Sequence, residues 1–469
     1  MTTILHSWLA TLAALLLALV IVQPASAATI TFANPAGNDG DGFGEAVAAL
    51  GSDRVIIGAP GDDTGATNSG IVYLFDANRN LLTTYYNPTP AMGDGFGASV
   101  AGLGSNHVII GAPHDSVGAT RAGAAYLFSA SGALLTTFTN PTPAFAEEFG
   151  ITVAAVGSDR VLVGAWGDNL GTISSGAAYL FSTNGALLRT FANPTPGIGD
   201  AFGRALAAIG SDLVLISAPG DDTGAGDAGS AYLLNTDGAL LTTITNPTPK
   251  SGEAFGYYSV AGVGPDKVIV GTHLENTSGT YAGAAYLFDT SGILLTTFTN
   301  PTPLLRRAFG QAVASVGSEY VLISAPEPLS SPWSGSVCLF KMDGTLVTNI
   351  PDPNPFFGGL FGYTVAAIGN DRAIVGAPEA GAGGEAYLIE LGNQSIAGQF
   401  RDPLFSPADG FRFTLFDATV GQAYRIQSAA SLSSATWTDL TNFTYTGPIV
   451  ITDPSAGSDA NKFYRAVTP

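Results

Sequence analysis

Acidic side chains recur in glycine-rich segments of the chain, and they are the groups most able to do chemistry. The segments Gly-Asp-Asp-Thr-Gly at 61–65 and 220–224 each hold two adjacent carboxylates. Such carboxylates either accept hydrogen bonds from the backbone amides of their own turn, or bind a cation or a basic ligand where several loops converge. The choice between these roles depends on the elements that position the loops.

These segments belong to a repeat that runs through most of the chain. The repeat is marked by a Phe-Gly pair, which occurs at Phe43, Phe96, Phe149, Phe202, Phe255, Phe309 and Phe361. The successive differences are 53, 53, 53, 53, 54 and 52 residues. A unit of this size cannot bury its apolar faces alone, so the units must stack against one another.

Each unit has the pattern of four strands. In the second unit, residues 98–104 and 107–113 flank a Gly-Ser-Asn turn, and residues 122–130 and 133–141 supply two more apolar runs. Radial stacking of seven such meanders gives a closed ring without exposed end faces. We therefore predict an all-β fold in which residues 28–400 form a seven-bladed β-propeller of four-stranded antiparallel blades.

Two segments compete to close this ring. Residues Thr29–Pro35 (TITFANP) match the fourth-strand segment of the repeat but precede the first blade, and Ser395–Pro403 (SIAGQFRDP) offer a second candidate. We favour the N-terminal strand, because joining both ends of the repeat region in one blade locks the ring.

The meander sorts the charges between the two faces of the propeller. Loops between the second and third strands, and between blades, emerge on one face and hold most of the acids, whereas turns on the other face pair an Asp with a basic residue, as at Asp53-Arg54. We predict that the first face is strongly acidic and binds the ligand through its variable loops. The candidate ligand-binding residues are Asp62, Asp63, Asp115, Trp166, Asp168, Asp221, Asp222, His273, Arg306, Arg307 and Trp333. Further acids expected on this face are Asp94, Glu147, Glu148, Asp200, Asp227, Glu253, Glu275, Glu327 and Glu379.

The paired motifs of each unit resemble a known repeat. FGASV, IIGAP and GAAYLF are similar to the FG-GAP repeats that build the seven-bladed propeller of integrin alpha chains and of many secreted bacterial proteins. The resemblance covers residues from about 29 to 400 and implies a propeller with a binding or adhesion role. Gly-Ala-Pro is intact at Gly58, Gly111 and Gly376, but becomes Gly-Ala-Trp at 164–166 and Gly-Thr-His at 271–273.

The chain departs from this family at the calcium loops. In many members, a loop of DxDxDG type joins the first two strands and supplies several oxygen ligands. The corresponding turns here, such as Gly51-Ser52-Asp53-Arg54, hold at most one carboxylate. We therefore predict no cofactor and little contribution of calcium to folding. EDTA should leave the melting temperature almost unchanged, and a large drop would contradict this interpretation of the turns.

No grouping in the sequence marks a catalytic site. A G-x-S-x-G nucleophile elbow is absent, and no two acids stand out as the pair that glycoside hydrolysis requires. His107 and His114 lie in the second unit and His273 lies in the fifth, without a repeated ligand partner, so no metal site is assigned. The sequence favours a non-catalytic binding or adhesion protein over an enzyme. The alternatives are a propeller-type polysaccharide hydrolase or lyase, and a purely structural envelope component.

The start of the chain indicates export. An apolar run over residues 9–22 precedes Ala25-Ser26-Ala27, which suits signal peptidase, so we interpret residues 1–27 as a signal peptide. An uncleaved membrane anchor is the alternative. We expect a secreted protein, or one at the cell surface or in the periplasm, without stable membrane insertion after cleavage.

Charge and cysteine content limit the partners further. Lys and Arg number 17 against 37 Asp and Glu, a net charge of −20, which disfavours nucleic acid and anionic membranes. We expect a monomer that binds an extracellular protein or glycan. Cys338 is the single cysteine, so an internal disulfide is excluded, and we predict that it is a buried packing residue.

Residues 401–469 leave the repeat and are predicted to form a small C-terminal β-sandwich. FRFTLF, AYRIQSA, ATWTDLTNFTYTG, PIVITDP and KFYRAVTP have the composition of five short strands between turn residues. This part resembles the immunoglobulin- or fibronectin-like modules of secreted bacterial repeat proteins. We predict that Trp437 packs in its core.

Overall fold

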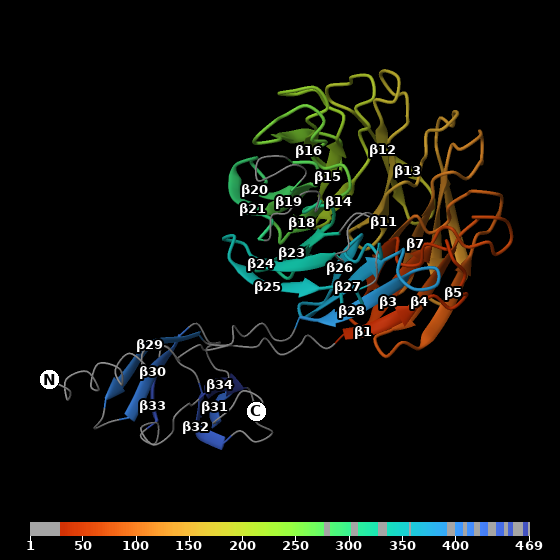
Figure 1. The fold of residues 1–469 in the computed structure, drawn as a ribbon. Helices are drawn as coiled ribbons and strands as arrows, with labels where there is room; N and C mark the ends of the chain where they lie inside the picture. Colours follow the sequence, from red (N-terminus) through yellow and green to blue (C-terminus); the bar gives the residue numbers. More distant parts are fainter. Residues whose placement is uncertain are drawn as a thin grey trace. The chain divides into compact units, whose positions relative to one another are not determined.

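Seven four-stranded antiparallel sheets arranged in a ring make up residues Ala28–Glu390 of the computed structural model (Figure 1). The described residues are 29–275, 282–301, 308–326, 335–355, 358–391, 399–406, 410–416, 423–429, 438–444, 449–453 and 463–467. The predicted signal peptide, Glu327, Arg306, Arg307, Trp333 and Trp437 lie outside these ranges. Strands are the only regular elements of the described part, where no helix is long and apolar enough to cross a membrane. The predicted all-β propeller is confirmed.

Each of the first six blades runs in sequence order from an inner to an outer strand. Blades 1 and 2 consist of β2 (Ala46–Leu50), β3 (Arg54–Ala59), β4 (Ile71–Asp76), β5 (Leu81–Tyr86), β6 (Ser99–Leu103), β7 (His107–Ala112), β8 (Ala124–Ser129) and β9 (Leu134–Thr139). Blades 3 and 4 consist of β10 (Val153–Val156), β11 (Arg160–Ala165), β12 (Ala177–Ser182), β13 (Leu187–Ala192), β14 (Leu206–Ile209), β15 (Leu213–Ala218), β16 (Ser230–Asn235) and β17 (Leu240–Thr245). Blades 5 and 6 consist of β18 (Val260–Val263), β19 (Lys267–Thr272), β20 (Ala284–Asp289), β21 (Leu294–Thr299), β22 (Val313–Val316), β23 (Tyr320–Ala325), β24 (Ser336–Lys341) and β25 (Leu346–Pro351).

The seventh blade joins the two ends of the repeat region. It contains β26 (Val365–Ile368), β27 (Arg372–Ala377), β28 (Glu385–Glu390) and, as its outer strand, β1 (Thr29–Ala33). β1 pairs antiparallel with β28 from Thr29 opposite Ile389 to Ala33 opposite Glu385, and the red and blue strands lie side by side in Figure 1. The N-terminal closure is therefore confirmed. The rival segment does not take this place, because β29 (Gln399–Ser406) pairs with a C-terminal strand instead.

The core lies between neighbouring blades. In blade 2, Phe96 of the Phe-Gly pair packs 5.8 Å from the Tyr126 ring and 6.1 Å from the Phe128 ring, while Tyr85 from the outer strand of blade 1 lies 5.4 Å from Phe128. All four side chains are buried. The Phe of each Phe-Gly pair is fully buried in all seven units, which explains why the repeat retains it.

A glycine before the third strand brings the backbones of adjacent loops together. This glycine is present in all seven blades, at Gly70, Gly123, Gly176, Gly229, Gly283, Gly335 and Gly384. Gly123 has φ +86°, and a β-carbon there would lie 2.0 Å from the Phe149 carbonyl oxygen of the next blade. Because an L side chain meets both a left-handed backbone and a steric overlap at this point, only glycine fits without distortion.

The turn face opposite the long loops carries paired charges, as predicted. Asp53–Arg54, Asp159–Arg160, Asp266–Lys267 and Asp371–Arg372 form ion pairs with N–O distances of 3.7, 3.6, 2.8 and 3.7 Å. Arg160 and Arg372 also donate to carbonyl oxygens of neighbouring blades, at Ser211 and Ser52. These turns therefore link blades, including the last to the first.

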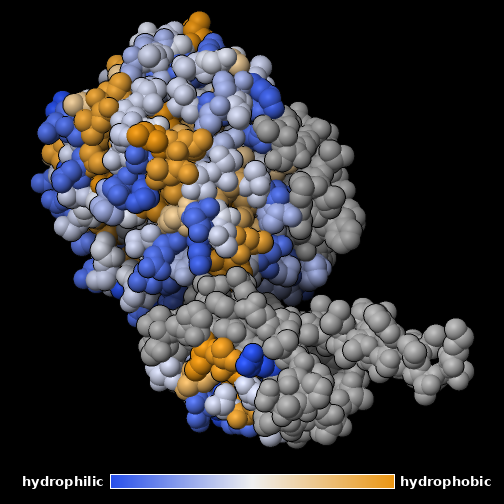
Figure 2. Space-filling model, turned by 90° about the vertical axis from the view of Figure 1, so that its left-hand side faces the viewer, coloured by the Kyte–Doolittle hydropathy of each residue, from blue (hydrophilic) through white to orange (hydrophobic). Residues whose placement is uncertain are grey.

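The outer strands leave pairs of leucines exposed. Leu81 and Leu82 are 47% and 48% exposed, and equivalent pairs occur in blades 2 to 5. In each of these strands a β-bulge falls at the pair, which breaks the alternation that would bury one residue of two. Figure 2 shows separate apolar patches among polar residues on one side of the molecule. Scattered apolar residues of this kind are normal on protein surfaces.

The C-terminal unit contains two three-stranded sheets. One has the order β29, β30 (Gly410–Phe416), β33 (Ile449–Asp453), and the other has the order β32 (Thr438–Thr444), β31 (Ala423–Ala429), β34 (Phe463–Val467). Tyr424, Ile426 and Ile451 are buried. A small all-β unit after the propeller is thus confirmed. The immunoglobulin- or fibronectin-like character of this unit stays a prediction.

Candidate functional site

The residue that follows each Phe-Gly pair stands just before the inner strand of its blade, so these residues surround the propeller axis at one end. In chain order they are Glu45, Ala98, Ile151, Arg204, Tyr257, Gln311 and Tyr363. The inner strands of neighbouring blades contact one another around the ring, which places this position at the same level in every blade. Its residue types differ from blade to blade, unlike the Phe-Gly pair itself.

Aromatic rings surround the Arg204 guanidinium. Its central carbon lies 4.7 Å from the centroid of the Tyr257 ring and 5.9 Å from those of Trp166 and Tyr258. Such contacts stabilise a cation through the negative faces of the rings, by about 0.5–1 kcal/mol each at exposed sites. We call Trp166, Arg204, Tyr257, Tyr258 and His273 the axial cluster. Its members come from blades 3, 4 and 5.

His273 completes the axial cluster as a neutral ring. It lies 4.7 Å from the Tyr258 ring and 5.9 Å from the Tyr257 ring, and those two tyrosines are 4.8 Å apart. Burial lowers the pKa of His273 to about 4. The imidazole is therefore uncharged at neutral pH and adds no positive charge beside Arg204.

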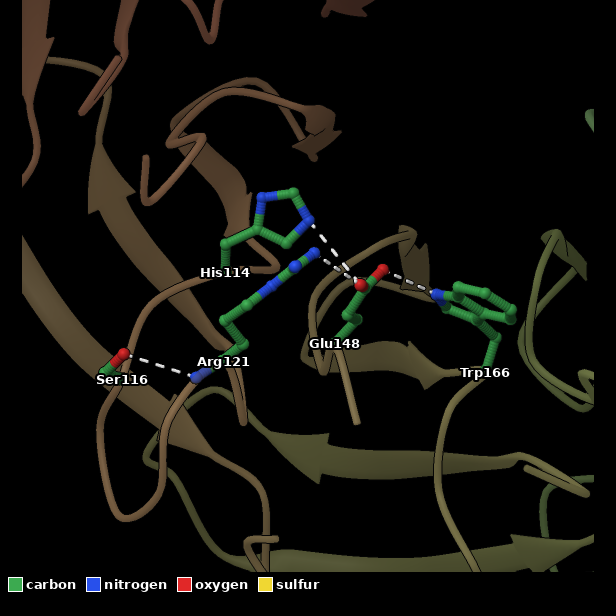
Figure 3. Close-up of polar contacts among 5 residues, drawn as sticks. All are labelled: His114, Ser116, Arg121, Glu148 and Trp166. Carbon is green, nitrogen blue, oxygen red and sulfur yellow. Dashed lines mark hydrogen bonds and ion pairs between the residues drawn. The ribbon is translucent and has the colours of Figure 1, made fainter. Parts of the chain in front are cut away.

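Glu148 contacts both the axial cluster and residues of blade 2. One carboxylate oxygen accepts a hydrogen bond from Trp166 Nε1 at 2.8 Å, and the other lies 2.8 Å from an Arg121 nitrogen and 3.6 Å from His114 Nε2 (Figure 3). Burial acts to raise the pKa of Glu148, but the hydrogen bonds from His114 and Trp166 and the nearby positive charges together lower it. Glu148 thus stays ionised and fixes the Trp166 indole.

The backbone of Glu148 is left-handed, with φ 54°. The same position is Gly42 or Gly95 in the first two blades, where a positive φ carries no side-chain penalty. A non-glycine residue in this conformation costs on the order of 1 kcal/mol. The same left-handed backbone occurs before the Phe-Gly pair at Ala201, Ala254, Ala308 and Leu360, so the conformation belongs to the repeat, and the positioning role of Glu148 rests on its bonds to Trp166 and Arg121.

Glu45 and Tyr363 occupy the other side of the axis. Burial, followed by repulsion from Glu379, raises the pKa of Glu45 to about 7, while His114 acts in the opposite direction. Burial, with charge interactions that include Glu45 and Arg204, raises the pKa of Tyr363 to about 12. Tyr363 therefore lies within electrostatic reach of both Glu45 and the axial cluster, as a neutral hydroxyl.

Protonation of Glu45 should make stability depend on pH. The folded protein holds this proton more tightly than the unfolded chain, whose Glu ionises near 4.5, so the contribution to stability is complete below pH 4.5 and is lost as the pH rises through 7. Glu45→Gln should remove a dependence of up to roughly 1.4 kcal/mol per pH unit. Denaturant unfolding at several pH values measures it, with exposed Glu319→Gln as control. Parallel curves for wild type and Glu45→Gln would contradict the assignment.

Several sequence-predicted site acids serve the fold instead. Tyr126 donates to Asp115, and Tyr179 to Asp168, both at 2.6 Å, and Tyr232 donates to Asp221 in the same way. These three acids, with Asp62 and Glu275, are buried. These acids were predicted on a ligand-binding face, but they are buried, and Asp62 Oδ1, for example, accepts a hydrogen bond from Thr64 N, the turn role that the sequence offered as the alternative.

The acids before the Phe-Gly pairs, which were predicted to belong to the acidic face, are also internal. Asn87 donates to Asp94 at 2.8 Å, and the same pairing joins Asn140 to Glu147, Asn193 to Asp200 and Asn246 to Glu253. These four acids are buried. Of the acids predicted on this face that lie within the described residues, those that remain exposed are Asp63, Asp222, Asp227 and Glu379.

Of the eleven predicted site residues, the structure brings Trp166 and His273 into the axial cluster. Arg306, Arg307 and Trp333 fall outside the described ranges, so their role stays a prediction, as does ligand binding by Asp63 and Asp222. Sequence reasoning missed Arg204, Tyr257 and Tyr258. Comparing the units position by position would have found them, because the residue after Phe-Gly changes from Ala98 to Arg204 and Tyr257.

The described residues contain no group of three or more His, Cys, Asp or Glu side chains that could hold a metal ion. Cys338 is buried, as predicted. The axial cluster offers aromatic faces, a guanidinium, phenol hydroxyls and a neutral imidazole.

Comparison with known families supports the repeat. Four segments match the FG-GAP repeat, at residues 32–75, 90–128, 138–181 and 197–234. They fall in the first four blades, and the structure continues the same four-stranded unit through three more. Among curated proteins, none matches the chain.

Proposed function

Because FG-GAP repeats here belong to a seven-bladed propeller, we propose that the protein is an exported binding or adhesion protein that engages an extracellular glycan or protein at the axial cluster. The observation that carries this proposal is the placement of Trp166, Arg204, Tyr257 and Tyr258 together on one side of the axis. Aromatic and arginine side chains are the types most enriched where binding energy is concentrated.

The exposure of the axial cluster supports this role. Tyr258 is 40% exposed, which is high for a large aromatic ring that contacts three other side chains. Trp166 and Arg204 are half-buried, so each keeps a surface for a partner while its orientation is fixed. A preorganised site of this kind loses little side-chain entropy on binding.

A ligand screen followed by site variants tests the proposal. The chain without residues 1–27 should bind a glycan or protein saturably, and Tyr258→Ala and Trp166→Ala should each weaken that binding roughly tenfold or more. Tyr86→Ala is the matched control, because Tyr86 is a 59% exposed tyrosine on the outer strand β5. Equal losses in Tyr258→Ala and Tyr86→Ala would exclude the axial cluster as the site.

Two other functions give different outcomes in the same screen. Turnover of a polysaccharide would support the hydrolase or lyase alternative, while saturable binding without turnover supports the binding protein. Failure of every glycan and protein ligand to bind would favour a purely structural envelope component.

A further inference from the structure

Arg204 carries a charge that no described carboxylate neutralises. The ion pairs of the described residues involve other cations, and the contacts of the guanidinium are with Trp166, Tyr257 and Tyr258. Aromatic faces attract a cation but do not remove its preference for an anion. Arg204 therefore offers a planar set of donors beside the rings.

The acid that contacts the axial cluster, Glu148, is already committed to other partners. Glu148 uses one oxygen for Arg121 and His114 and the other for Trp166, so it holds the indole rather than Arg204. The His273 ring is neutral, so it adds neither a positive nor a negative charge beside Arg204. The region around Arg204 is thus locally cationic, although the chain as a whole has a net charge of −20.

Resting on the proposed function, we propose that the axial cluster recognises a saccharide that carries a carboxylate, with Arg204 paired to the carboxylate and Tyr258 or Trp166 stacked on the sugar ring. A guanidinium matches a carboxylate with two parallel hydrogen bonds. The negative face of an aromatic ring suits the C–H face of a sugar, and the hydroxyls of Tyr257 and Tyr363 suit its hydroxyl edge. A carboxylate on a peptide would also satisfy Arg204, but a uronic acid presents the carboxylate and a flat C–H face on one small ring.

The overall negative charge does not prevent this pairing at physiological salt. Charges separated by more than a Debye length of about 8 Å are largely screened. A direct hydrogen-bonded contact with Arg204 acts inside that distance and is strengthened by the partial burial of the guanidinium. Binding of an acidic saccharide through this contact should therefore persist near 0.15 M salt.

The test compares matched ligands. Oligomers of galacturonate, glucuronate and mannuronate are titrated against the whole chain beyond residue 27, each beside the same oligomer with its carboxyl groups reduced to alcohols. At least one acidic oligomer should bind, and its reduced form should bind roughly tenfold or more weakly, because one charge-assisted contact is lost. Binding of none of the acidic oligomers, or equal binding of both forms, overturns the inference.

Variants locate the carboxylate contact. Arg204→Gln should bring the affinities for the acidic and the reduced oligomer to within about twofold of each other, whatever its effect on both, whereas Arg204→Lys should retain part of the difference. Arg54→Gln on the opposite face is the control, and the melting temperature of each variant verifies folding. Unchanged preference for the acidic oligomer in Arg204→Gln overturns the inference. If a neutral sugar or a protein binds instead and Tyr258→Ala abolishes that binding, the proposed function stands and this inference alone fails.

Discussion

Replacing Phe32 by Ala should lower the free energy of unfolding of the propeller by about 3–5 kcal/mol, the usual cost of removing a buried phenylalanine. Phe32 is 2% exposed and lies 5.3 Å from the ring of Phe75 in blade 1. It is on β1, which completes the seventh blade, so its loss opens the contact between the last and first blades. Chemical denaturation of wild type and variant measures the difference.

The matched comparison is Phe138→Ala, which removes the equivalent ring from the outer strand of blade 2 and should cost a similar amount. Truncation after Leu391 should leave the unfolding transition of the propeller in place, because β29 pairs outside the propeller. A loss of that transition on truncation, together with a neutral Phe32→Ala, would show that the C-terminal segment closes the ring.

Gly123→Ala should also destabilise the propeller strongly, by about 3 kcal/mol or more. The change combines a left-handed backbone, which costs alanine about 1 kcal/mol, with a steric overlap against the Phe149 backbone that forces two blades apart. Backbone atoms cannot rotate away as a flexible side chain can, so the strain must spread into neighbouring strands.

Gly104→Ala separates the two contributions. Gly104 has φ +60°, but nothing lies within 4 Å of an added β-carbon. This variant should therefore lower the free energy of unfolding only by the conformational cost of about 1 kcal/mol. Thermal unfolding of both variants measures the difference. Equal destabilisation would mean that the close approach of Gly123 to the next blade contributes nothing.

The fold could be predicted because its signals are local and repeated. The constant spacing of Phe-Gly pairs set the number of blades, and the match of Thr29–Pro35 to a fourth strand identified the closing strand. The C-terminal unit gave a weaker prediction, since its strands occur once and lack a period that fixes their pairing. There the structure shows two three-stranded sheets.

The site was harder to predict because sequence does not separate buried from exposed carboxylates. In Asp-Asp pairs such as Asp221-Asp222, the first acid accepts a bond from a tyrosine and the second is exposed. The signal was the tyrosine 11 residues after the first acid, a spacing shared by Asp115 and Asp168. Burial depends on the third strand lying beneath the loop, which requires the fold.

The axial cluster was missed for a related reason. Trp166 and His273 were noted as departures from Gly-Ala-Pro, but Arg204 and Tyr257 follow a different motif, the Phe-Gly pair, in blades 4 and 5. Their meeting depends on the ring geometry, because no two of these four residues are close in sequence. Once the ring is known, the residue after each Phe-Gly pair can be placed just before an inner strand, beside the propeller axis.

A crystal structure of the protein with a ligand from the screen tests the central claim most directly. The account predicts ligand density in contact with Tyr258 and Trp166, with an acidic group of the ligand within hydrogen-bond distance of Arg204 where the ligand is a uronate oligomer. Ligand density confined to the exposed acids Asp63 and Asp222, or to the C-terminal unit, with the axial cluster empty, would contradict it.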